Sequence, residues 1–103
     1  MSLLEEIIAN TKKSRADRPN IIGDIVNINF NRIVARLKQF SQDSIDAKFV
    51  CGLASTRDAD AVELRLNNEE VETINKRVIG RLECTGFLVS RNCDNITISW
   101  KID

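Results

Sequence analysis

Two residue types that often carry out catalysis are missing from this sequence. The chain of 103 residues contains no histidine and no tyrosine. Histidine is the commonest general base and a frequent metal ligand, so serine and cysteine triads and ordinary zinc sites are excluded. A catalytic carboxylate pair or a lysine nucleophile is not excluded, but no spacing of residues identifies a candidate for either. We therefore expect a protein that is not an enzyme, with no catalytic residue, no metal site and no cofactor.

The cysteines and glycines carry no motif either. Three cysteines, Cys51, Cys84 and Cys93, lack metal-ligand spacing, and an odd number in a chain without an export signal indicates reduced thiols. The four glycines stand too far apart to form a phosphate-binding loop. Gly80 falls inside a predicted helix at a cost of about 1 kcal/mol relative to alanine, which is compatible with close approach of another backbone or with no function.

Charge and hydropathy place limits on the partners. Glu5 and Glu6 lie where a signal peptide would be basic, and no apolar run approaches the ~20 residues of a membrane span, so we expect a cytoplasmic protein with no membrane partner. The net charge is zero, but the charged residues are mostly basic over residues 10–40 and mostly acidic over residues 39–75. This asymmetry could steer a partner or align two copies, although two solvated faces would look the same.

The clearest element is a helix that begins near Asn67 or Asn68 and stops at Gly86. Carboxylates fill its first turn, where the helix dipole favours them, and Gly86 can adopt the left-handed conformation that ends a helix. Its apolar face consists of Val71, Ile74, Val78 and Leu82. A hairpin follows, with strands at residues 87–91 and 96–102 around a polar turn. Alternation in the last strand predicts that Ile96, Ile98 and Trp100 are buried against this helix.

The N-terminal region predicts two further helices. The first, over residues 3 to about 12, is too short to be stable alone in water, so its apolar stripe must dock on the body or on another copy of the chain. We expect a homo-oligomer for this reason. A basic linker ending at Pro19 should follow over residues 11–20. The candidate interaction residues of this segment are Leu3, Leu4, Ile7, Ile8, Lys12, Lys13, Arg15 and Arg18.

The second helix should span residues 22–40, capped by Asn20 or Asp24. Its apolar positions are Val26, Phe30, Ile33, Leu37 and Phe40. Residues 49–53 and 62–66 then read as two strands. The expected order is α-α-β-β-α-β-β, which predicts an α+β fold of two layers, with helices on one face of a four-stranded antiparallel sheet. Residues 1–20 form the N-terminal helix and linker, and residues 21–103 the single domain.

The sequence RLECTGFLVSR at residues 81–91 resembles the join between recognition helix and wing in winged-helix DNA-binding domains. By that resemblance Lys76, Arg77, Arg81 and Arg91 would contact DNA. Two features depart from the family. A short helix and tight turn are needed before the recognition helix, whereas residues 61–66 alternate as a strand does. The acids Glu69, Glu70 and Glu72 also stand where phosphates would lie.

A second resemblance is to small accessory proteins encoded by bacteriophages, and it rests on size, the N-terminal helix and the final strand DNITISW at residues 94–100. It implies a protein that binds and occludes a protein partner. We therefore predict a non-catalytic protein-interaction module of this accessory or inhibitor type. The alternative is a winged-helix-like DNA-binding regulator, although we do not expect nucleic acid as a partner.

Overall fold

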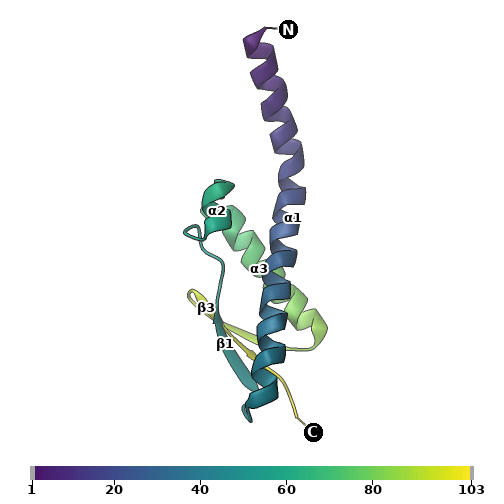
Figure 1. The fold of residues 1–103 in the computed structure, drawn as a ribbon, viewed down its shortest axis with the longest axis vertical. Coiled ribbons are helices and arrows are strands. Elements are labelled where there is room, and N and C mark those ends of the chain that lie inside the picture. The colour runs from purple at the N-terminus through teal and green to yellow at the C-terminus, as the bar shows by residue number, and fades with distance from the viewer. Residues whose placement is uncertain (1, 103) are drawn as a thin grey trace.

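A single helix, α1 (Leu3–Asp43), runs for 41 residues along the length of the molecule (Figure 1). The computed structural model describes residues 2–102. The side chain of Ser2 caps the helix by accepting a hydrogen bond from the backbone N–H of Glu5 at 3.2 Å. The fold as a whole is α+β, with this long helix and a three-stranded antiparallel sheet.

The predicted division of this region into two helices and a linker is wrong. Residues 11–20 belong to α1, Pro19 lies inside it, and neither Asn20 nor Asp24 begins a helix. Proline interrupts a helix by removing one backbone donor and by crowding the preceding turn. Here the residues before it, with Lys12, Lys13 and Arg15 among them, are mostly good helix formers. The helix therefore continues through the proline.

The predicted strand at residues 62–66 is also wrong. After β1 (Lys48–Gly52), the chain forms a short helix, α2 (Ala59–Glu63), and then a tight turn. In this turn the backbone N–H of Leu66 donates to the carbonyl of Ala61 at 2.9 Å, and Arg65 adopts a positive φ of 53°. Ala61 and Leu66 are buried while Val62 is exposed. The alternating pattern thus reflects a turn that buries two side chains, and the sheet has three strands and not four.

The helix α3 (Asn68–Thr85) confirms the prediction made from its caps. Asn67 accepts a hydrogen bond from the backbone N–H of Glu70, and Glu70 accepts one from the backbone N–H of Asn67, so the two form a capping box. Gly86 ends the helix with a φ of 111°, and the N–H of Phe87 donates to the carbonyl of Leu82.

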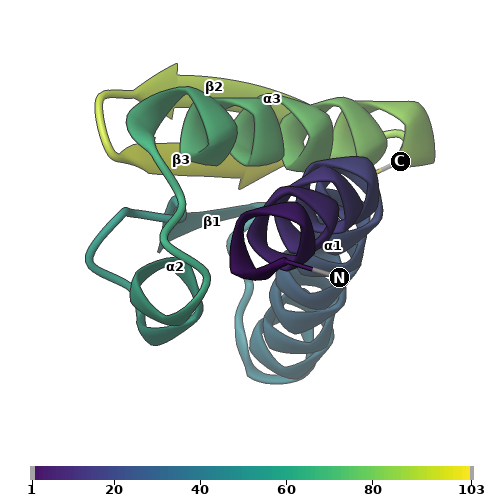
Figure 2. The ribbon, with the colours of Figure 1, turned by 90° about the horizontal axis from the view of Figure 1, so that it is seen from above.

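The predicted hairpin is confirmed as β2 (Leu88–Asn92) and β3 (Asn95–Ser99), and the strand order is β1-β3-β2. Val89 pairs with Ile98, and Phe49 of β1 pairs with the same residue from the other side. Ile96 and Ile98 are fully buried, as predicted. Seen from above in Figure 2, α3 lies along β2 and β3 while α1 stands beside them. Trp100 falls beyond the end of β3 and is only half-buried.

The hydrophobic core lies between the second half of α1, α3 and the sheet. From α1 it takes Ile25, Val26, Ile33 and Leu37. From α3 it takes the four residues predicted from the sequence, Val71, Ile74, Val78 and Leu82. Residues 3–17 of α1 contribute nothing to this core, and they project beyond the body of the molecule (Figure 1).

Candidate interaction surfaces

The projecting part of α1, residues 3–17, is called here the N-terminal arm. Its side chains are all exposed. Four of them are large and aliphatic, with exposed fractions of 72% for Leu3, 68% for Leu4, 51% for Ile7 and 44% for Ile8. The predicted stripe is therefore present, helical and uncovered in the single chain.

This stripe continues the face of α1 that is buried in the body. A separation of 18 residues equals five helical turns, so Ile7 and Ile8 lie on the same side of α1 as Ile25 and Val26. The latter two are buried. The arm thus exposes to solvent an apolar face that is buried 18 residues further along the same helix. Lys12, Lys13 and Arg15 are exposed beside it.

Arg18 has a different role from the one predicted, because it joins the base of the arm to the body. Its guanidinium donates to both carboxylate oxygens of Glu70, at 2.6 and 2.9 Å, and to the carbonyl oxygens of Leu64 and Arg65, at 2.9 and 3.1 Å. The hydrogen bond from Arg18 is the main reason that the pKa of Glu70 lies below its usual value. Arg18 therefore fixes the turn between α2 and α3 against α1.

Two of the four predicted DNA-contacting residues are engaged inside the molecule. The guanidinium of Arg81 lies 4.1 Å from the ring centre of Phe30 and donates to the side chain of Asn27. Arg91 donates to both carboxylate oxygens of Glu72, and this hydrogen bonding is the main cause of a lowered Glu72 pKa.

The other two, Lys76 and Arg77, are exposed on α3. The acidic Glu69 and Glu83 are exposed on the same helix. A methyl group built on Gly80 would meet no atom within 4 Å, so no backbone within the described part of the chain explains this glycine.

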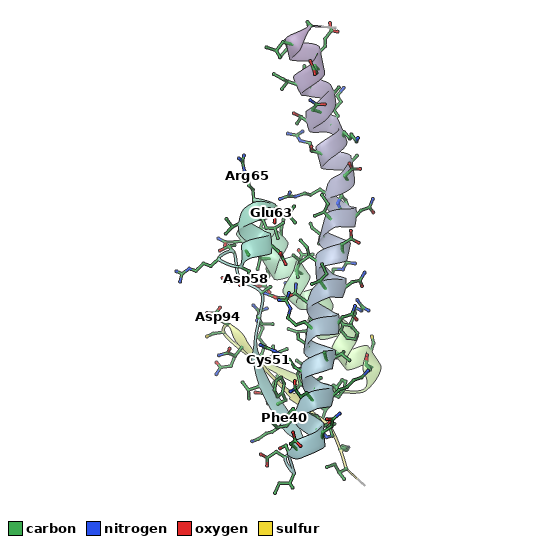
Figure 3. The ribbon with its side chains drawn as sticks, viewed as in Figure 1. Phe40, Cys51, Asp58, Glu63, Arg65 and Asp94 are labelled. Carbon is green, nitrogen blue, oxygen red and sulfur yellow. The ribbon has the colours of Figure 1, made fainter. Side chains whose placement is uncertain are left out.

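A further surface, which was not predicted from the sequence, lies at the end of the molecule opposite the arm. Four of the five aromatic residues gather there, and this cluster of Phe40, Phe49, Phe87 and Trp100 is called here the aromatic end. Phe40 lies 5.1 Å from Phe49 and 6.5 Å from Trp100 between ring centres, and Phe87 lies 6.3 Å from Trp100. All four residues are half-buried. Figure 3 shows Phe40 at this end. The four residues come from distant parts of the chain, so no local spacing could predict the cluster.

A hollow of about 300 Å³ opens beside Trp100 and Phe87. Its other lining residues are Leu37, Lys38 and Ser41 of α1. Among the residues that the structure describes, none that lines this hollow is acidic. A second hollow, on the other side of Phe40, is lined by Asp43 as well as Arg36 and Phe49. The first hollow thus has an apolar floor and a single, basic charge.

Metal-ligating groups, buried polar atoms and cysteines were the other features of residues 2–102 that could mark a site. No group of side chains in this range could hold a metal ion, and no buried side-chain polar atom lacks a hydrogen-bond partner. Cys51 is buried, which raises the pKa of its thiol, while Cys84 and Cys93 are exposed thiols. No helix within the described range has the length and apolar character needed to cross a membrane.

Comparison with known proteins adds no assignment. No protein family model, no curated protein and no solved structure matches this chain.

Proposed function

We propose that this protein is a non-catalytic binding module that acts through protein contacts, with the N-terminal arm as its main contact surface. The observation that carries the proposal is the exposure of Leu3, Leu4, Ile7 and Ile8 on a helix that projects from the body. Monomeric soluble proteins rarely leave contiguous apolar patches uncovered unless they serve an interaction. Occlusion of a protein partner by such a surface fits the accessory-protein role that the sequence suggested.

The energy available from covering the arm is substantial for a protein of this size. Burial of one fully exposed leucine or isoleucine side chain is worth about 1.5–3 kcal/mol. Four side chains that are between 44% and 72% exposed therefore offer several kcal/mol to a partner. A second copy of the chain is one such partner, and we propose that the protein is a homo-oligomer.

Light scattering tests this proposal. The full chain at about 100 μM, well above micromolar dissociation constants, should have the mass of at least two copies. The variant Ile8→Ser should be shifted toward monomer. Ile28→Ser is the matched control, because Ile28 is on the same helix and is 47% exposed against 44% for Ile8, but lies in the body. A wild-type chain that is monomeric at this concentration would contradict self-association.

DNA binding is the second candidate, and one observation favours it. The short helix α2, the tight turn, α3 and the β2–β3 hairpin occur in the order that the winged-helix resemblance requires. The structural objection raised by the apparent strand at residues 62–66 no longer applies. The electrostatic objection still applies, because Arg81 and Arg91 are engaged internally and Glu69 lies in the first turn of the helix that would enter the groove.

A fluorescence-anisotropy titration of the protein against mixed-sequence and randomised DNA duplexes distinguishes the two candidates. We expect only weak binding that fades at physiological salt and does not depend on sequence. Submicromolar, sequence-selective binding that is weakened by Lys76→Ala and Arg77→Ala, and not by Lys12→Ala and Lys13→Ala on the arm, would establish the winged-helix function instead.

A further inference from the structure

The charges of the N-terminal arm are arranged so that a second arm, running in the opposite direction, complements them. We propose that two copies pair through their arms as an antiparallel dimer with two-fold symmetry, in which Glu5 of each copy contacts Lys12 of the other. This inference rests on the proposed function, because it names the surface of the second copy that covers the apolar stripe.

Glu5, Ile8 and Lys12 lie along one side of the arm. Their separations of three and four residues are each close to one helical turn, so the three side chains share a face. Neither Glu5 nor Lys12 has an oppositely charged side chain three or four positions away on α1. Within the described residues, neither takes part in an ion pair. Both charges are therefore available to another copy.

An antiparallel pairing with its two-fold axis beside Ile8 matches these charges. If residue 5 of one arm lies opposite residue 12 of the other, symmetry forms the same contact a second time. Ile7 and Ile8 of the two copies then meet at the centre, and both are exposed in the single chain. The result is an apolar centre flanked by ion pairs, which is the arrangement that sets partner and orientation in coiled coils.

Other arrangements of the two arms place like charges together. A parallel pairing in register gathers Glu5 and Glu6 of both copies at one level and Lys12 of both at another. It also aligns the two helix dipoles. An antiparallel register that sets Leu4 opposite Ile8 brings Glu5 of one copy within one helical turn of Glu5 of the other. Charge therefore favours the register that pairs residue 5 with residue 12.

The length of the arm accommodates this register. Residue 3 of one copy lies opposite residue 14 of the other, so the overlap covers residues 3–14, about 18 Å of helix. The body begins at Arg18, whose guanidinium contacts Glu70 and Leu64. Leu3 of the second copy therefore lies about one helical turn before Arg18. Because the arm projects beyond the body (Figure 1), the two bodies lie at opposite ends of the dimer.

Charge-reversal variants test the inference by light scattering at low salt. Glu5→Lys and Lys12→Glu should each weaken self-association about tenfold, because each change replaces two attractive contacts with two repulsive ones. The double variant Glu5→Lys/Lys12→Glu should recover the wild-type affinity, since it restores both contacts. Circular dichroism checks that every variant keeps its helix.

The neighbouring residues provide matched controls. Glu6→Lys and Lys13→Glu make the same changes of charge, but both residues lie on the other side of the arm from Ile8. Each control should change the affinity by less than about twofold.

Three results would overturn the antiparallel pairing. They are single variants that associate as strongly as wild type, a double variant that stays as weak as the single variants, and controls that weaken association as much as Glu5→Lys. In each case the wild-type chain still self-associates, so the proposed function stands. A wild-type chain that is monomeric at about 100 μM would overturn both.

Discussion

The two halves of α1 carry the same apolar face and meet different surroundings. In the second half, Ile25 is 6% exposed, because α3 covers it. In the first half, Ile7 lies five turns earlier on the same side and is 51% exposed. Periodicity in a sequence therefore identifies which face of a helix is apolar. It does not identify what covers that face, and on the arm no residue that the structure describes covers it.

The two halves also differ in what stabilises them as helix. Burial against α3 stabilises the second half. The arm has only its cap at Ser2, its helix-forming residues and its continuity with the second half. A helix of about 15 residues is marginal in water on its own. The arm should therefore open locally at low cost, while the body opens only with the whole fold.

The largest expected effect comes from truncating the same residue type in the two halves. Ile25→Ala should lower the free energy of unfolding by about 2–5 kcal/mol, because it removes buried atoms and leaves a cavity. Ile7→Ala should change it by less than about 0.5 kcal/mol in the monomer. Urea denaturation at low protein concentration measures both. Equal losses for the two variants would show that the arm is packed within the single chain.

A smaller effect should follow at the joint between the halves. Arg18→Ala should lower the free energy of unfolding by about 1–2 kcal/mol, since it removes charge-assisted hydrogen bonds from a guanidinium that is about one-third exposed. Arg91→Ala, which breaks the more exposed pair with Glu72, should cost less. The same denaturation series ranks them, and a larger loss for Arg91→Ala would contradict this role of Arg18.

Acid should weaken the same joint. The pKa of Glu70 is lowered in the folded state, so its contribution is fully present above the unfolded value of about 4.3 and is lost as the pH falls through the folded value. The wild-type free energy of unfolding should therefore fall below about pH 4 more steeply than that of Glu70→Gln. Parallel pH profiles for the two proteins would show that the Arg18–Glu70 pair contributes nothing measurable.

The smallest effect is a gain in stability in the body. Gly80→Ala should raise the free energy of unfolding by about 0.5–1 kcal/mol, because alanine is the better helix former and its methyl group would meet no atom within 4 Å. The opposite substitution in the arm, Ala9→Gly, should leave the free energy of global unfolding nearly unchanged. A loss of stability in Gly80→Ala would show that this part of α3 is more crowded than the structure indicates.

The parts of the fold that could be predicted are those encoded locally. Asn67, Glu70 and Gly86 fix both ends of α3, and the alternation of Ile96 and Ile98 fixes the buried face of β3. The linker predicted at Pro19 was wrong, because the local cost of proline in a helix was outweighed by the stability of the helix on both sides of it. The strand predicted at residues 62–66 was wrong, because a short helix followed by a turn can show the same alternation of apolar and polar residues as a strand.

The candidate surfaces divide in the same way. The stripe on the arm could be read from the spacing of Leu4 and Ile8. The aromatic end could not, because Phe40, Phe87 and Trp100 become neighbours only when the sheet pairs and α1 packs against it. The ion pair of Arg18 with Glu70 could not be predicted for the same reason, since the two residues are 52 positions apart in the sequence.

Hydrogen exchange of the arm at two protein concentrations tests most directly whether the arm is a docking surface for another copy. At low micromolar concentration the amides of residues 3–17 should exchange nearly as fast as in an unfolded chain, while those of α3 stay protected. At about 100 μM, where we propose that copies associate, the arm should become protected and its rates should approach those of the body. Arm amides that exchange at the same rate at both concentrations would contradict the account.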